Sequence, residues 1–363
     1  MSILAAIAVL GILIFVHELG HFAAARLQKI HVNGFSIGFG PALLKYQGPE
    51  TLYAFRVIPL GGFVSFPDDD PESEIPPEDP NLLSNRPILD RAIVISAGVI
   101  ANLVFAYLLL VGQVATVGMQ EVNYLPGVLV PQVLSEKESV AARAGIQAGD
   151  TIVAVNNREL EASKDGIEYL MSTIQDSANK SIDLTVKRDA EIKTISLEPS
   201  VGNDGKGKIG VMLQPNNEII RRRPDSLGEI FAVGAKEFDR ITMLTFGGFW
   251  QLVTNFQETA QQVAGPVAIV AVGAELAQND LANLFQFAAL ISINLAIINI
   301  LPLPALDGGQ LAFLAIEGLR GKPLPSRIQE NIMQTGIVLL LGLGVLIIIR
   351  DTTRLDFFQQ LFQ

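Results

Sequence analysis

Hydrophobic residues along this chain gather into four long, nearly continuous stretches separated by more polar segments. They run over Ile3–Ala25, Ala92–Gly118, Leu281–Leu303 and Ile332–Ile349. A helix that crosses the hydrocarbon core of a bilayer needs about 20 mostly apolar residues, so each stretch predicts a transmembrane helix. The last stretch is the shortest and contains glycines, and we expect flanking residues to help it reach both membrane interfaces.

The segment between the second and third stretches has a different pattern. From Val122 to Pro215, short runs alternate polar and apolar residues as β-strands do, and a helical stretch over Ser163–Gln175 interrupts them. This pattern predicts a compact α+β domain. We therefore divide the chain into a first membrane half over residues 1–118, this domain over 119–215, a connector over 216–280 and a second membrane half over 281–363.

The two linking segments of the membrane part differ in composition. The connector holds the single tryptophan, Trp250, among phenylalanines and two glycines, which is typical of an amphipathic segment lying at the membrane interface. The segment Pro67–Pro80, "PDDDPESEIPPEDP", is too acidic and too rich in proline to pack, and it predicts a disordered linker.

Basic residues near the ends of the apolar stretches predict the orientation of the chain in the membrane. The first and third loops carry them, at Arg26, Lys29, Arg86, Arg91, Arg320, Lys322 and Arg327. Because loops rich in Lys and Arg stay on the cytoplasmic side, the central domain is expected to be exported.

Composition supports a membrane protein and excludes one class of partner. Hydrophobic residues make up 49% of the chain, charged residues 17%, and the mean hydropathy is +0.39. The formal net charge of −11 removes the electrostatic basis for nucleic-acid binding. The sequence contains no cysteine, so any metal site must use His, Asp or Glu.

Three ionisable residues, His17, Glu18 and His21, lie at the end of the first apolar stretch in the sequence "HELGH". On a helix, residues four apart share one face, so both histidines can bind one metal ion while Glu18 reaches a water molecule beside it. This is the H-E-x-x-H pattern of zinc peptidases. A signal peptide is the alternative for the stretch, but no Lys or Arg precedes it and HELGH separates the apolar run from the small residues at Ala23–Ala25.

A third ligand is expected near the end of the third apolar stretch, where "NILPLPALDGG" covers Asn299–Gly309. Two prolines and two glycines break the helix around Asp307, and broken backbone at membrane depth is tolerated only where it is buried or lines a cavity. The spans alternate in direction, so Asp307 and HELGH fall on the same, cytoplasmic side. The sequence therefore predicts a His17–His21–Asp307 site, whereas His31 is expected to be a surface residue.

Two resemblances extend this interpretation. "SVAARAGIQAGDTIVAVNNREL", over Ser139–Leu160, resembles bacterial PDZ domains, which take extended peptides by strand addition. The chain also resembles the site-2 protease family of intramembrane metalloproteases, in the branch of the bacterial regulator-of-sigma-E protease. The segments that carry this resemblance are "FVHELGH", "NGFSIGFGP", "IPLGGFV", "SAGVIAN", "GPVAI" and "LDGG".

The second resemblance implies one Zn²⁺ held by His17, His21 and Asp307, with Glu18 as the catalytic base. It also implies that Asn299, Pro302 and Asn102 position the substrate beside the metal. The glycine-rich strands expected over Gly34–Gly40 and Leu60–Val64 match a membrane-dipping β-hairpin that offers an edge to unwound substrate. The implied fold is a multi-span α-helical membrane protein with about four transmembrane helices and an inserted α+β PDZ domain.

The implied substrates are single-span membrane proteins, such as anti-sigma factors, and remnant signal peptides, cleaved in regulated intramembrane proteolysis. The expected partners are these substrates, the lipid bilayer and peptide ends at the PDZ groove, although a PDZ domain that only blocks access remains an alternative. We expect a multi-pass protein of the bacterial plasma membrane, with a photosynthetic membrane left open. Two other classes are a catalytically inactive PDZ-containing membrane scaffold, against which the intact ligand set argues, and a zinc-regulated transporter, against which the otherwise apolar spans argue.

Overall fold

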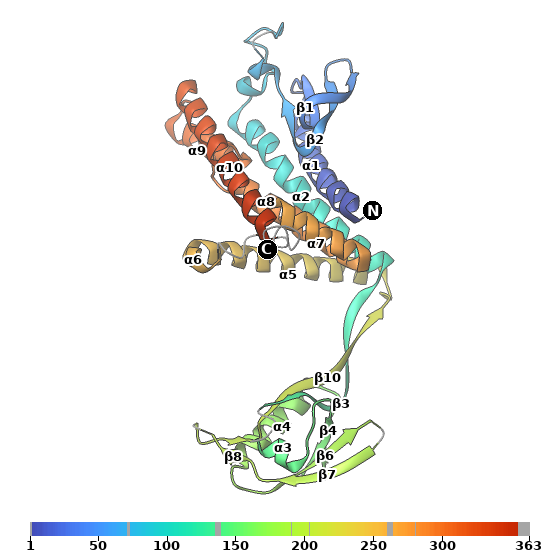
Figure 1. The fold of residues 1–363 in the computed structure, drawn as a ribbon. Helices are drawn as coiled ribbons and strands as arrows, with labels where there is room; N and C mark the ends of the chain where they lie inside the picture. The colour runs from blue at the N-terminus through green and yellow to red at the C-terminus, as the bar shows by residue number, and fades with distance from the viewer. Residues whose placement is uncertain are drawn as a thin grey trace. The chain divides into compact units, whose positions relative to one another are not determined.

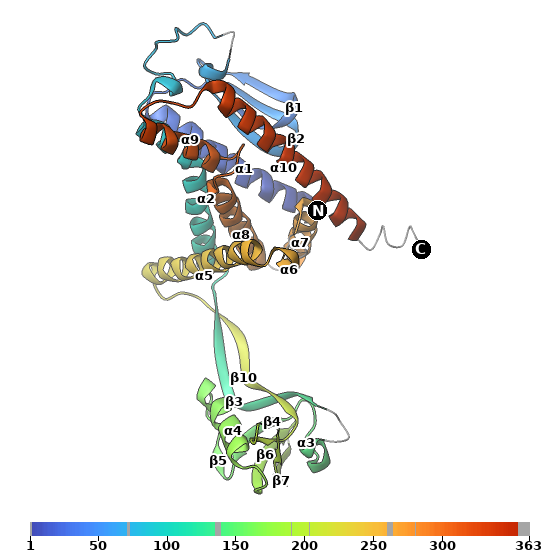
Figure 2. The same cartoon turned by 90° about the vertical axis from the view of Figure 1, so that its left-hand side faces the viewer.

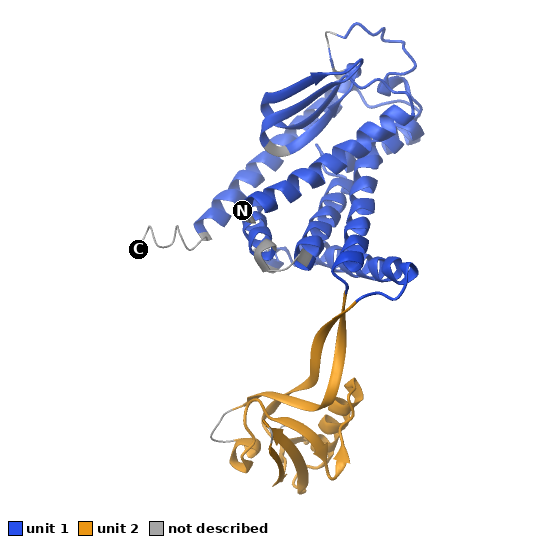
Figure 3. Cartoon of the chain, turned by 90° about the vertical axis from the view of Figure 1, so that its right-hand side faces the viewer, with its two compact units in different colours: residues 1–118, 223–363 blue, residues 119–222 orange. Residues whose placement is uncertain are grey.

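The computed structural model describes residues 2–70, 73–134, 139–189, 191–202, 204–259, 264–279 and 281–354. The chain divides into two compact units, residues 1–118 with 223–363, and residues 119–222 (Figure 3). The last residues of the predicted second membrane half, 355–363, lie outside the described part of the chain.

The first unit contains four helices that are long and apolar enough to cross a membrane. These are found within α1 (Ser2–Leu27), α2 (Ile88–Thr116), α8 (Leu281–Ile300) and α10 (Ser326–Arg354), as Figure 1 shows. These four candidate spans lie where the sequence predicted apolar stretches. The fourth is longer than expected, because α10 begins at Ser326, ahead of Ile332, and continues past Ile349 to Arg354.

Small residues let the helices that carry HELGH and SAGVIAN approach closely. A Cβ added at Gly20 of α1 would lie 2.4 Å from the carbonyl oxygen of Ala97 and 2.7 Å from the Cβ of Ala101, both on α2. Larger residues at these positions would hold the two backbones apart. The α1–α2 contact therefore depends on glycine and alanine, as helix contacts in membranes commonly do.

Four further helices complete the described part of this unit. They are α5 (Leu227–Thr254), α6 (Phe256–Thr259), α7 (Pro266–Asn279) and α9 (Asp307–Arg320). In both Figure 1 and Figure 2, α5 runs crosswise to α2, and its Phe238 and Ile241 pack in a cluster with Leu110 of α2 and Ile293 of α8. The opposite side of α5 exposes large apolar side chains, among them Met243, Phe246, Trp250 and Val253.

Strands β1 (Gly34–Gln47) and β2 (Leu52–Ser65) form a separate small sheet beside α1. Both strands bend, so residues 34–37 pair with 52–55 on one side and, in the opposite direction, with 62–65 on the other. Gly61, with φ of +93°, belongs to the bend in β2, where a residue with a side chain would be strained. Residues 62–65 are thereby left as an edge of this sheet.

The acidic segment 67–80 differs from the expectation of a disordered linker. Among its described residues, Asp68 accepts hydrogen bonds from the backbone N–H groups of Leu83 and Ser84, at 3.1 and 2.8 Å. Asp79 also accepts one from the N–H of Asn81, at 2.7 Å. Acidic side chains therefore serve as local backbone acceptors here, a role that composition alone does not reveal.

The second unit is an α+β domain. Its main sheet has the order β10–β3–β4–β6–β7, and β5 pairs with β4. The elements are β3 (Met119–Val133), α3 (Val140–Ala144), β4 (Thr151–Val155), β5 (Arg158–Glu159), α4 (Lys164–Asp176), β6 (Ile182–Arg188), β7 (Glu191–Leu197), β8 (Ser200–Val201), β9 (Gly207–Lys208) and β10 (Val211–Arg222). Alternate residues of the strands point into one apolar core, with Leu170 and Ile174 of α4.

Two features of this domain bear on the predicted PDZ resemblance. β10 lies at an edge of the sheet next to α4, which is the arrangement that strand addition of a peptide requires. The turn before β4 is fixed by Asp150, which is buried and accepts bonds from Nε and Nη2 of Arg188 at 2.7 and 2.8 Å. Pairing of β10 with β3 continues to Arg222, past Pro215, where we expected the domain to end.

Candidate metal site

Three predicted ligands from two distant parts of the sequence come together in the first unit. The side chains of His17 and His21 project from α1, and Asp307 is the first residue of α9. Nε2 of His17 lies 3.2 Å from Nε2 of His21, and Oδ2 of Asp307 lies 3.3 and 3.4 Å from these two nitrogens. Tetrahedral zinc with bonds of about 2.0–2.1 Å separates its ligand atoms by about 3.3 Å, so the three atoms fit this ion.

The hydrogen bonding of Asp307 also fits a metal. Its Oδ2 is buried and makes no hydrogen bond with any described residue, although two imidazole nitrogens lie close to it. A buried carboxylate oxygen without a hydrogen-bond partner is costly unless a cation lies in front of it. The unpaired oxygen faces the two imidazoles, where a shared cation would satisfy it.

The remaining nitrogen of each histidine has a neighbour on α2. Nδ1 of His21 lies 2.9 Å from the carbonyl oxygen of Val94 and donates to it, which leaves Nε2 unprotonated for a metal. Nδ1 of His17 lies 3.3 Å from the side-chain amide of Asn102, which is completely buried and has an unpaired Oδ1. With Nε2 on a metal, Nδ1 carries the proton, and a half-turn of the Asn102 amide places Oδ1 to accept it.

Glu18 lies beside the cluster and is buried. It interacts electrostatically with His17, His21 and Asp307. The backbone of β2 closes over it, because a Cβ at Gly62 would lie 2.8 Å from Cγ of Glu18. A carboxylate in this place can take a proton from a water molecule between the ligands and the edge of the sheet.

The residues predicted to position substrate are placed differently. The amide nitrogen of Asn299, on the last turn of α8, lies 3.3 Å from Nε2 of His17, on the metal side of the ring. Pro302 is exposed in the turn between α8 and α9, and its role stays a prediction. His31 is outside the cluster, with Nε2 3.7 Å from Asp79, as expected for a surface residue.

Glycines that carry no chemistry make room for the site. A Cβ on Gly98 of α2 would lie 2.3 Å from Nε2 of His21 and 2.8 Å from Cε1 of His17. Gly308 and Gly309 allow α9 to begin tightly against the end of α8, because a Cβ on either would lie within 2.5 Å of a backbone oxygen of residues 300–303. The sequence predicted the LDGG turn but not the roles of Gly98 and Val94. The one feature that relates these two residues to the site is their helical spacing from Asn102.

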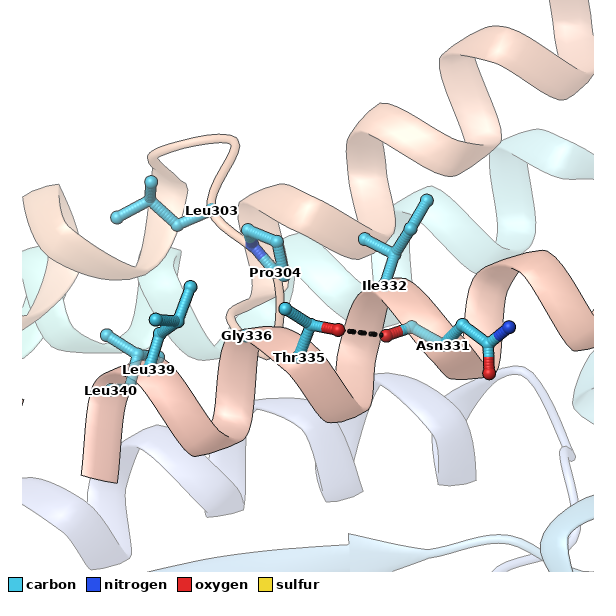
Figure 4. A pocket seen from close by; sticks show the side chains of 8 residues that line it. All are labelled: Leu303, Pro304, Asn331, Ile332, Thr335, Gly336, Leu339 and Leu340. Carbon is cyan, nitrogen blue, oxygen red and sulfur yellow. Dashed lines mark hydrogen bonds between the residues drawn. The ribbon is translucent and has the colours of Figure 1, made fainter. Parts of the chain in front are cut away.

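An apolar cavity of about 380 Å³ lies between α10 and the turn that leads to Asp307 (Figure 4). It is lined by Leu303, Pro304, Asn331, Ile332, Thr335, Gly336, Leu339 and Leu340. α10 comes close to this turn at Gly336, where an added Cβ would lie 2.3 Å from Cβ of Pro304. The N–H of Ala305 also contacts Sδ of Met333 at 3.3 Å.

The membrane helices and the His–His–Asp cluster together define a membrane metalloprotease, and comparison with known proteins agrees. A family model described as peptidase family M50 matches residues 5–343, and the chain belongs to this family. The predicted relationship to site-2 proteases and the predicted metalloprotease class are thereby confirmed.

Relatives match over nearly their whole lengths. A putative zinc metalloprotease of Nostoc sp. is 62% identical, with 100% of both chains covered. The chloroplastic membrane metalloprotease ARASP of Arabidopsis thaliana is 48% identical, over 99% of this chain and 80% of its own. The regulator of sigma-W protease RasP of Bacillus subtilis is 29% identical, over 98% and 99%.

Among solved structures, a PDZ domain from an SdrC-like protein of Listeria monocytogenes aligns with 24% of this chain and 88% of its own. The sequence identity is 18% and the TM-score is 0.22, a score too low to carry an argument. The PDZ assignment of the second unit therefore stays a prediction that its strand order and its edge strand support.

Proposed function

We propose that this chain is an intramembrane zinc endopeptidase that hydrolyses peptide bonds within or near the transmembrane segments of single-span membrane proteins. The observation that carries the proposal is the spacing of 3.2–3.4 Å among three ligand atoms from α1 and the start of α9. The names of the relatives, which include zinc metalloproteases, support zinc as the ion.

In this proposal His17, His21 and Asp307 hold the zinc ion, which when bound polarises the scissile carbonyl and lowers the pKa of a water molecule to about 7. Glu18 takes the proton from the attacking water and passes it to the leaving amine. Asn299, whose amide lies beside Nε2 of His17, donates to the substrate carbonyl and helps to orient it. The buried Asn102 keeps His17 in the tautomer that the metal requires.

Substrate must reach Glu18 in an extended form, because the carbonyl groups of a helix are already hydrogen-bonded and shielded. The edge formed by residues 62–65 lies next to Glu18 through Gly62, and an unwound segment can pair with it as an added strand. The sheet exposes apolar side chains suited to contact with lipid, at Phe39, Leu43, Leu44, Tyr46, Phe55, Val57 and Ile58. These features support a hairpin that dips into the membrane.

We infer that the natural substrates are single-span regulators such as anti-sigma factors, together with remnant signal peptides. The printed name of RasP, a regulator of sigma-W protease, supports this class. The second unit is exported, and its β10 edge either binds peptide ends or limits access to the site. The bacterial plasma membrane is the proposed location, with the active site near the cytoplasmic side, as the basic residues of the first and third loops predict.

The test is cleavage of a model single-span substrate by the full chain in detergent, with zinc content measured in parallel. Glu18→Gln is expected to abolish cleavage while it leaves zinc content near one ion per chain, because this carboxylate moves a proton and is not a ligand. Glu330→Gln, at an exposed glutamate of α10, is the matched control and should behave as wild type. Cleavage retained by Glu18→Gln would contradict the mechanism, and absent zinc in the wild type would favour an inactive scaffold.

A further inference from the structure

One face of α2 contacts both histidine ligands. Val94 and Asn102 lie eight residues apart and therefore on nearly the same face of the helix, and they contact Nδ1 of His21 and Nδ1 of His17 respectively. Arg91 precedes Val94 by three residues and so continues this face by one turn toward the start of α2. Val94 and Asn102 orient the two histidines, and the place of Arg91 on the same face suggests a similar role toward Asp307.

Arg91 forms a two-pronged ion pair with Glu317 of α9. Its Nη1 donates to Oε2 of Glu317 at 3.0 Å, and its Nη2 donates to Oε1. Only 16% of the Arg91 side chain and 15% of the Glu317 side chain are exposed. Bidentate Arg–carboxylate pairs fix relative orientation as well as distance, so this contact fixes α9 against the start of α2.

Few side chains of α9 are fully buried. Among its residues only Gly308, Gly309 and Leu314 are buried, and the glycines contribute no side chain. Leu306 at its N-cap makes no side-chain capping bond, and Leu319 is 90% exposed. Leu314 is the one large side chain of the helix that is fully buried, and Leu311 and Phe313 are half-buried, so the ion pair adds a directional contact to a moderate amount of apolar burial.

Asp307 and Glu317 are joined by a continuous helix. They lie ten residues apart on α9, which is about 15 Å at 1.5 Å per residue. A rotation or shift of the helix at Glu317 is therefore transmitted to its first residue. Asp307 can be displaced only slightly, because the three ligand atoms, 3.2–3.4 Å from one another, must all stay within bonding distance of one ion.

We propose that Arg91 and Glu317 are positioning residues that set the carboxylate of Asp307 against His17 and His21. The inference rests on the proposed function, in which these three residues bind zinc. In this proposal one face of α2 orients all three ligands. It contacts His17 and His21 directly and acts on Asp307 through α9.

The test measures zinc affinity of the purified full chain by competition with a chromogenic chelator, together with the melting temperature of the metal-free protein. Loss of an outer contact to a metal ligand commonly weakens metal binding about 10–100-fold, and we expect Glu317→Gln to fall near the lower end of that range. Arg91→Lys keeps the positive charge but cannot donate two parallel hydrogen bonds to Glu317, and it should weaken zinc binding less than Glu317→Gln does. The double variant Arg91→Glu/Glu317→Arg preserves the combined length of the pair, and it should bind zinc more tightly than either single reversal.

Glu237→Gln is the matched control, since Glu237 pairs with Arg240 on the exposed surface of α5. A purely structural pair would lower the melting temperature and leave the zinc affinity of the folded protein unchanged. If Asp307→Asn loses zinc while Glu317→Gln binds it within twofold of wild type, the positioning role is overturned and the proposed function stands. Absence of zinc from the wild type would overturn both.

Discussion

Two helices of this chain, α2 and α10, have similarly apolar central segments but are buried to very different extents in the structure. The mean hydropathy of their most apolar windows is 2.4 for α2 and 2.6 for α10. In α2, 39% of that window is buried, and in α10 only 6% is. Apolar composition therefore identifies both as spans but does not tell which one supports the catalytic chemistry.

The difference lies in a few small and polar positions. On α2, Gly98 makes room for the imidazoles and Asn102 is completely buried against His17. On α10, nothing lies within 4 Å of a Cβ placed at Gly342 or Gly344. In a membrane the lipid is as apolar as the side chains, so close backbone approach and polar contacts decide which helix packs.

The largest effect is expected from Gly98→Ala. The new methyl group would lie 2.3 Å from Nε2 of His21 and 2.8 Å from Cε1 of His17, and in the proposed zinc site neither ring can move without leaving the ion. We expect loss of bound zinc and of detectable cleavage. Zinc content and single-span substrate cleavage, measured on the purified variant, check this.

Gly344→Ala is the control for the same substitution on α10. Its methyl group meets open space, and alanine favours a helix over glycine by about 1 kcal/mol, so activity should remain at the wild-type level. Equal loss in both variants would show that glycines in these spans matter for helix folding rather than for room at the site.

Asn102→Ala is expected to have an intermediate effect. It removes the partner of Nδ1 of His17, and loss of such an outer contact typically costs about 10–100-fold in metal affinity or activity. Asn331→Ala, at an exposed asparagine of α10, should change zinc affinity little. A chelator competition on both variants measures the contrast, and equal affinities would remove Asn102 from the site.

The same contrast shows how far the sequence could predict the site. The four-residue spacing in HELGH places His17 and His21 on one face of a helix, and the broken helix around LDGG marks Asp307, so all three were predicted and the structure brings them together. Residue type was informative there because ionisable groups are expensive in a membrane. The roles of Val94 and Gly98 could not be predicted, since a backbone carbonyl and an absent side chain leave no chemical signature in the sequence.

Long-range contacts formed a second limit. Arg91 was read only as a basic residue near a membrane boundary, yet it pairs with Glu317, which lies 226 positions further along the chain. Likewise, the acidic segment 67–80 was predicted to be disordered, because its charge was considered without the N–H groups that Asp68 contacts. In both cases the missing information was the partner, which local patterns do not contain.

The smallest effect is expected at Gly336, where α10 lies close to the turn before Asp307. Gly336→Ala would bring a methyl group within 2.3 Å of Cβ and 2.9 Å of the carbonyl oxygen of Pro304, at the cavity shown in Figure 4. Because α10 is mostly exposed, it can shift outward, and an overpacking cost of about 1 kcal/mol corresponds to a roughly fivefold lower kcat/KM. Zinc affinity should stay near wild type, since none of the three proposed ligands lies on α10: His17 and His21 belong to α1 and Asp307 to α9. Gly342→Ala is the control without a close neighbour. If Gly336→Ala lost zinc as completely as Gly98→Ala, α10 would support the metal site as directly as α2 does, and the distinction between the two helices would fail.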